Sequence, residues 1–255
     1  MSPGERRAAA GPGRRRAWLL LHRHVGLWLG MVLSLIGVTG SLLVFDHALD
    51  EALNPQFWTA ATAEGPHLPL QDLIAAAARA LPDGQSPSDV SLPRVPGGAV
   101  LIYAGPAEDR YALQVTVDPV VGRVLGQRPT DEPLMAVVYD LHYTLLAGDT
   151  GFVVVGLCGI ALLVGLVSGV VVWWPRGGKW RQAFGIKRGA SGARLTVDLH
   201  RTHGIYALPV LAVVAFSGVY MVFPEWITPA VSAVSPVTPL PQGLRSAPAG
   251  GRTPL

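Results

Sequence analysis

Three long apolar stretches without a charged side chain constrain this chain more than any other feature of its sequence. They cover Val25–Phe45, Phe152–Trp174 and Ile205–Phe223. Each is long enough to cross the roughly 30 Å hydrocarbon core of a membrane as an α-helix. The composition agrees, since 50% of the 255 residues are hydrophobic and only 15% are charged. We therefore predict an integral membrane α-helical bundle of three transmembrane helices, at residues 18–47, 151–175 and 199–224.

Basic residues gather on one side of these spans. Six arginines precede residue 25, and seven Lys or Arg residues lie between positions 176 and 201. Because Lys and Arg are enriched in cytoplasmic flanks, we predict a basic cytoplasmic N-terminus over 1–17 and a basic cytoplasmic loop over 176–198. The segment Asp50–Thr150 carries 13 acidic against 5 basic residues, which suits the opposite side. The basic balance thus reflects membrane topology, and we expect no nucleic-acid partner.

The segment between the first two spans is long enough for a small soluble module. The stretch LPLQDLIAAAARALPDG predicts a helix over Leu70–Leu81. The stretches GGAVLIYAG and DRYALQVTVDP alternate apolar and polar residues, as half-buried strands do. A turn at Asp118–Gly122 leads to a further short strand. We predict a small α+β domain over 48–132, with one helix on an antiparallel sheet, and then an amphipathic helix over 133–150 on the outer membrane surface.

A polar hexapeptide is repeated at the start of two spans, as LHRHVG from residue 21 and LHRTHG from residue 199. Setting His22 over His200 also aligns Arg23 with Arg201, so a whole span is repeated with the same polarity. The two histidines are therefore expected at the same depth, and ionisable residues inside a span tend to mark functional sites. Two imidazoles at equal depth on separate helices suit the ligation of one haem iron from opposite sides. The two arginines suit the haem propionates.

The residue chemistry alone leaves a purely structural interpretation open. A His-Arg pair at a membrane interface can extend into the headgroups, and repeated glycines can pack helices. The choice of ligand is open as well, because His203 lies one turn deeper on the same face as His200 and is the obvious substitute.

The three spans resemble those of the PepSY-associated transmembrane family. The resemblance is carried by Leu-His at three span starts (LHRHVG, LHYTLLAG and LHRTHG), by Thr-Gly or Ser-Gly late in each span, and by WWP after the second. The stretch VTVDPVVGRVLG also resembles the closing hairpin of PepSY domains. The family includes iron-regulated inner-membrane proteins of bacteria and reductases of siderophore-bound iron that carry two b-type haems.

This resemblance implies a PepSY-like periplasmic domain, a place in the bacterial inner membrane and the activity of a haem-dependent ferric reductase. By the resemblance, His22 and His200 ligate a haem b near the cytoplasmic face, and His142 serves a second haem near the outer face. Longer members have a fourth span that can supply the other ligand of that second haem. Here residues 225–255 instead predict a disordered periplasmic tail rich in Pro, Gly and Ser. His47, a full span away from His22, is the candidate replacement, and a homodimer, a fourth-span partner or a single haem are the alternatives.

We expect the chain to pass electrons across the bilayer to ferric iron or a ferric siderophore outside. Since the sequence shows no dinucleotide or flavin fingerprint, we expect a quinol or a protein as electron donor, with membrane lipid as the other partner. Two other hypotheses are a non-redox protein whose PepSY-like module binds or restrains a periplasmic partner or peptidase, and a transport subunit that uses the intramembrane histidines.

Overall fold

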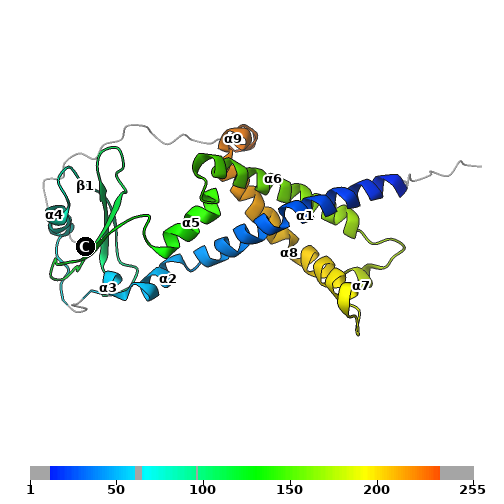
Figure 1. The fold of residues 1–255 in the computed structure, drawn as a ribbon, viewed down its shortest axis with the longest axis horizontal. Helices are drawn as coiled ribbons and strands as arrows, with labels where there is room; N and C mark the ends of the chain where they lie inside the picture. Colours follow the sequence, from blue (N-terminus) through cyan, green and yellow to red (C-terminus); the bar gives the residue numbers. More distant parts are fainter. Residues whose placement is uncertain (1–11, 61–64, 96, 236–255) are drawn as a thin grey trace, which may run out of the picture. The chain divides into compact units, whose positions relative to one another are not determined.

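The computed structural model describes residues 12–60, 65–95 and 97–235, which form two compact units (Figure 1). The helical unit comprises residues 1–38 and 142–238, and the sheet unit comprises residues 39–141 and 239–255. Among the described residues, three helices are long and apolar enough to cross a membrane: α1 (Pro12–Leu43), α6 (Gly148–Trp173) and α8 (Gly192–Val222). The predicted fold class, a bundle of three membrane helices with a small α+β domain, is therefore confirmed.

Two of the membrane helices begin earlier than we predicted from the charge-free stretches. The helix α1 extends back to Pro12 and α8 to Gly192, through segments rich in Arg. Arg is a good helix former and can place its charge in the headgroup region, so charge alone does not end a helix. In the register of the repeat, α1 and α8 now begin and end at nearly equivalent positions, so the repeat covers the entire helices.

Glycine allows α6 and α8 to pack closely. A Cβ atom placed on Gly156 would lie 2.5 Å from Cγ1 of Val222, and one placed on Gly159 would lie 2.9 Å from Cγ2 of Val219. Only a residue without a side chain permits this approach, as is common between membrane helices. Elsewhere apolar side chains point outward, and Met31 on α1 is 84% exposed, as expected for a surface that lipid covers.

A strained turn joins α5 (Leu134–Thr144) to α6. Leu145 and Leu146 adopt the left-handed conformation, with φ of 54° and 59°. A Cβ on Gly151 would lie 1.5 Å from the carbonyl oxygen of Thr144, so the end of α5 rests directly on the first turn of α6. Glycine at position 151 is therefore required by the chain path.

The predicted disordered tail over 225–255 is wrong for its first part. Residues Pro224–Ser232 form α9, and the positions from 236 onward lie outside the described residues. Pro224 takes the first helical position, where its missing N–H costs nothing, and Trp226 stacks on Phe223 with ring centroids 4.4 Å apart. The Pro- and Gly-rich composition on which the prediction rested belongs to the later residues.

The described part of the sheet unit contains one four-stranded antiparallel sheet with the strand order β1-β2-β3-β4. The strands are β1 (Ser86–Ser91), β2 (Val100–Gly105), β3 (Leu113–Val117) and β4 (Val124–Pro129). The helix α4 (Leu70–Ala80) packs on the sheet, as predicted, and two short helices, α2 (Asp46–Leu53) and α3 (Pro55–Trp58), precede it. The strand β1 was not predicted, because it is polar and contains Pro87 and a bulge, both typical of edge strands.

The core of the sheet unit lies between α4 and the sheet. Leu73 of α4 and Ile102, Val115 and Val117 of the central strands are fully buried together. The predicted turn into β4 is also present, with Oδ1 of Asp118 accepting hydrogen bonds from the next backbone amides.

Candidate functional site

The repeated histidines of α1 and α8 lie face to face in the helical unit. The ring centroids of His22 and His200 are 6.0 Å apart, and the ring planes are inclined by 55°. Two imidazoles that share one metal ion through bonds of roughly 2 Å have their centroids about 6 Å apart. The structure thus brings together the pair that the repeat predicted, at a spacing that suits a shared metal.

Hydrogen bonds fix the orientation and tautomer of His22. Its Nδ1 lies 3.1 Å from the carbonyl oxygen of Gly165 and 3.1 Å from Oγ of Ser168. A carbonyl only accepts, so Nδ1 carries the proton and donates, and Nε2 keeps the lone pair that a metal needs. The buried Ser168 hydroxyl in turn donates to Gly165. This is the outer-shell arrangement by which proteins orient histidine ligands.

Small residues on α6 let α1 come close to it. A Cβ on Gly169 would lie 3.2 Å from Cε1 of His22, tighter than ordinary contact. Gly165, Ser168 and Gly169 share one helical face, and this spacing of small residues often marks helix contacts in membranes. We did not assign these three residues to the site, although the small-residue spacing could have pointed to them.

The two arginines of the repeat are not equivalent in the structure. Nη2 of Arg201 donates to the carbonyls of Gln182 (2.8 Å) and Gly185 (2.7 Å) and lies 3.3 Å from Oδ1 of Asp198. Arg23 is exposed, and among the described residues no hydrogen bond or ion pair is found for its side chain. Arg201 therefore holds the segment before α8, and Arg23 is the member of the pair that has its guanidinium available.

The other histidines have separate surroundings. The Nδ1 of His142, near the end of α5, donates to the carbonyl of Ile36 at 2.9 Å. His203 bonds the carbonyl of Leu199 on its own helix at 2.9 Å, and its ring is exposed. Only His22 contacts the ring of His200 among the described residues. The described chain also holds no cluster of three or more His, Cys, Asp or Glu side chains that could bind a metal.

His47 belongs to the sheet unit, on α2. Its exposed ring lies 3.4 Å from the carboxylate of Asp46 and borders a cavity of about 230 Å³ together with Glu51, Trp58 and Tyr103. No item of its surroundings in this unit brings it to another histidine, so its predicted ligand role stays a prediction.

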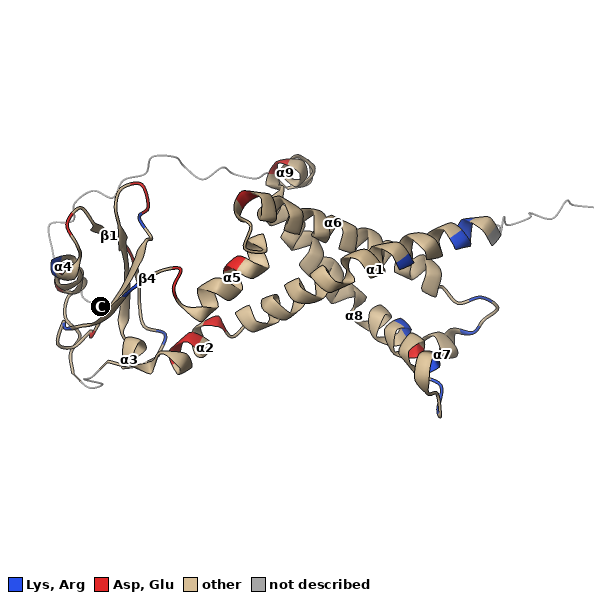
Figure 2. Cartoon of the chain, viewed as in Figure 1, with Lys and Arg blue, Asp and Glu red and all other residues tan. Residues whose placement is uncertain are grey.

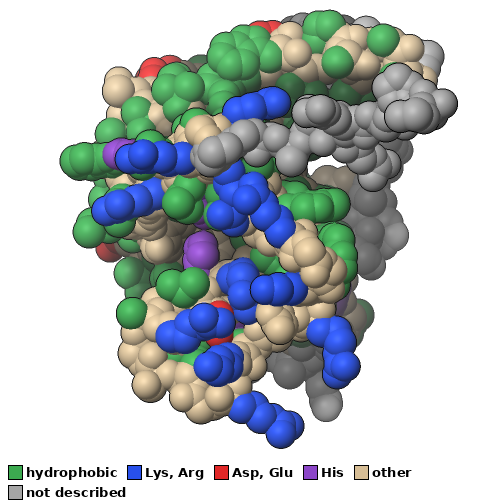
Figure 3. Space-filling view, turned by 90° about the vertical axis from the view of Figure 1, so that its right-hand side faces the viewer, with side chains coloured by type: hydrophobic (Ala, Val, Ile, Leu, Met, Phe, Trp, Pro, Cys, Tyr) green, Lys and Arg blue, Asp and Glu red, His purple; other side chains and the backbone are tan. Residues whose placement is uncertain are grey.

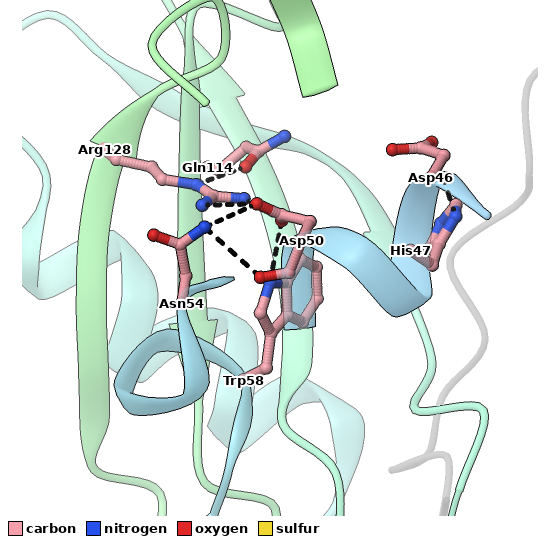
Figure 4. A network of polar contacts seen from close by, with 7 residues as sticks. All are labelled: Asp46, His47, Asp50, Asn54, Trp58, Gln114 and Arg128. Carbon is pink, nitrogen blue, oxygen red and sulfur yellow. Dashed lines mark hydrogen bonds and ion pairs between the residues drawn. The ribbon is translucent and has the colours of Figure 1, made fainter. Parts of the chain in front are cut away.

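A buried ion pair in the sheet unit was not predicted from the sequence (Figure 4). Asp50 of α2 accepts hydrogen bonds from Nη1 of Arg128 (3.1 Å), from Nε1 of Trp58 (2.8 Å) and from Nδ2 of Asn54 (2.7 Å). Nε of Arg128 donates to Gln114 at 2.8 Å. Burial raises the pKa of Asp50, but the donors and the charge of Arg128 outweigh it and hold the pKa below its ordinary value. The pair fastens α2 to β4.

Comparison with known families gives a match over nearly the whole chain. The family model described as PepSY-associated TM region matches residues 19–254. This confirms the resemblance drawn from the span motifs. A search of curated proteins found no significant match.

Proposed function

The chain belongs to the PepSY-associated TM family, and from that premise we propose that it binds haem b between α1 and α8 and serves electron transfer to ferric iron. The observation that carries the proposal is the opposed pair His22 and His200, with ring centroids 6.0 Å apart. Two imidazoles on opposite sides suit an iron that already has four nitrogen ligands in a plane. When bound, haem b supplies one-electron transfer at a potential that its axial ligands help to set.

The residues around His22 support this role. The bond from Nδ1 to Gly165 presents Nε2 as a ligand and raises its basicity, and Ser168 holds the acceptor in place. On the other helix, Arg201 keeps the segment before α8 fixed beside His200. Arg23, exposed one residue beyond His22, is the residue we assign to the propionates.

The charge distribution supports an orientation in the bacterial inner membrane. In the helical unit, basic side chains lie on the first turns of α1 and around α7 (Trp180–Ala183) (Figure 2). Positive flanks remain in the cytoplasm, so we place these ends there and the sheet unit, with its many acidic residues, in the periplasm. The ferric substrate, free or siderophore-bound, is then reduced on the periplasmic side, and a quinol or a protein supplies the electrons.

The number of haems follows from the same geometry. The paired histidines provide one complete set of axial ligands, and His142 is the candidate for a second haem. His142 is held by Ile36 within the helical unit, whereas His47 belongs to the sheet unit. A second haem on His142 therefore needs a ligand from a homodimer, a fourth-span partner or His47.

Ferric reduction by the purified full-length chain tests the proposal. Protein produced in haem-supplied cells is chemically reduced, freed of reductant and mixed without oxygen with ferric citrate or a ferric hydroxamate. A ferrous-specific dye then reports the product. We expect ferrous iron in proportion to haem content, and no formation above background with His22→Ala/His200→Ala. A haem-containing protein that yields no ferrous iron would refute the proposed substrate and favour the non-redox hypothesis.

A further inference from the structure

The segment between α6 and α8, which we call the basic loop (residues 174–191), is a folded surface that the proposed function leaves unused. From residue 176 to residue 197 the chain has six Lys or Arg residues and no acidic residue. The short helix α7 lies inside it. A positive flank of a span needs no defined structure, so the fold of this loop requires a separate explanation.

Side chains of α6 and α8 hold the backbone of the basic loop. The four consecutive carbonyls of Gln182–Gly185 each accept a hydrogen bond from a side chain. Arg201 donates to the first (2.8 Å) and the last (2.7 Å), Trp173 donates to the second (3.2 Å) and Tyr206 to the third (3.5 Å). The loop is therefore fixed on the ends of both membrane helices.

The nearest acidic side chain is already neutralised. Asp198 is 1% exposed and pairs with Arg194 (3.0 Å) and Arg201 (3.3 Å). Its Oδ2 also accepts the backbone N–H of Lys187. Five exposed cations remain for which no ion pair or side-chain hydrogen bond is found among the described residues: Arg176, Lys179, Arg181, Lys187 and Arg188.

Exposed aromatic side chains stand among these cations. Trp174 is 57% exposed and Trp180 is 43% exposed, and their rings contact each other at 5.4 Å. Trp at the end of a membrane helix marks the interface between hydrocarbon and headgroups. Figure 3 shows Lys and Arg side chains gathered on this face with hydrophobic side chains between them. The surface thus combines positive charge and aromatic rings at the end of α6.

We propose that the basic loop binds the headgroups of anionic phospholipids. Uncompensated Lys and Arg beside a span attract anionic lipid, and Trp174 and Trp180 place them at the depth of the lipid phosphates. The aromatic rings at the end of a membrane helix favour lipid over an acidic protein, which would dock farther from the bilayer. This proposal does not depend on haem or on ferric reduction.

Spin-labelled lipids test the proposal with the full-length chain in phosphatidylcholine membranes. The spectrum gives the fraction of label immobilised by the protein, for phosphatidylglycerol and for phosphatidylcholine. We expect a several-fold preference for phosphatidylglycerol that falls towards one in K179Q/R181Q/K187Q/R188Q and at high salt. The matched control R79Q/R94Q/R110Q/R123Q removes the same charge from the sheet unit and should keep the preference.

Further arms separate the remaining outcomes. The charge-conserving variant K179R/R181K/K187R/R188K should keep the preference, and single substitutions replace the fourfold variant if circular dichroism shows loss of helix. Soluble glycerol phosphate should not displace the label, and complete displacement would mean a site for free phosphate. An equal affinity for both lipids, or a preference unchanged in the neutral variant, would overturn the proposal and leave an acidic protein as the partner.

Discussion

The ion pair between Asp50 and Arg128 should carry a large part of the stability of the sheet unit. The carboxylate is 8% exposed and the guanidinium 12% exposed, so neither charge is well solvated. Removing one partner, as in Asp50→Ala or Arg128→Met, leaves the other charge buried and unpaired and should cost about 3–5 kcal/mol. The double variant removes both charges, so its loss should be smaller than the sum of the single losses by about 2 kcal/mol.

The pH dependence of this pair has a definite sign. The pKa of Asp50 is lowered in the folded state, so its contribution is complete above the unfolded pKa of about 3.9 and is lost as the pH falls through the folded value. The difference in stability between the wild-type protein and Asp50→Asn should therefore be constant near neutral pH and shrink below about pH 4.

Urea unfolding of the full-length chain in micelles measures both effects. Trp58 donates to Asp50, so its emission reports this contact, and Trp58→Phe identifies its part of the signal. Losses that add in the double variant, or a difference between wild type and Asp50→Asn that grows in acid, would refute the reasoning.

Three further predictions concern the helical unit. Gly156→Ala should lower the unfolding temperature in detergent, because the new Cβ would lie 2.5 Å from a side chain of α8, whereas Gly218→Ala, with nothing within 4 Å, should change it little; equal effects would contradict the packing. Leu146→Gly should raise the same temperature by relieving a left-handed leucine that costs about 1–2 kcal/mol, and a decrease would count against strain in this turn. Ser168→Ala should weaken haem binding about 10-fold in a haem titration by loosening the support of His22, and an unchanged affinity would remove Ser168 from the site.

Strong and local signals made much of the fold predictable. The charge-free stretches identified the three spans, and the periodicity of residues 70–81 identified α4. The repeated hexapeptide predicted that His22 and His200 lie at one depth, and the structure places their rings together. In each case a few neighbouring residues determine the outcome, so no long-range contact had to be known.

What the sequence did not reveal depends on contacts between distant residues. Asp50 and Arg128 are 78 positions apart, and neither stands in a recognisable motif. The repeat also suggested equal roles for Arg23 and Arg201, yet only Arg201 has carbonyls of the basic loop within reach. The contact of His22 with Gly165 depends on how α1 meets α6, which hydropathy does not specify.

The central claim, a haem held by His22 and His200, is tested most directly by the reduced-minus-oxidised visible spectrum of the purified full-length protein. The account predicts sharp b-type bands with at least one haem per chain, lost in His22→Ala and in His200→Ala and retained in His203→Ala, whose ring bonds its own helix. A colourless protein from haem-supplied cells, or bands that persist in both ligand variants, would contradict it.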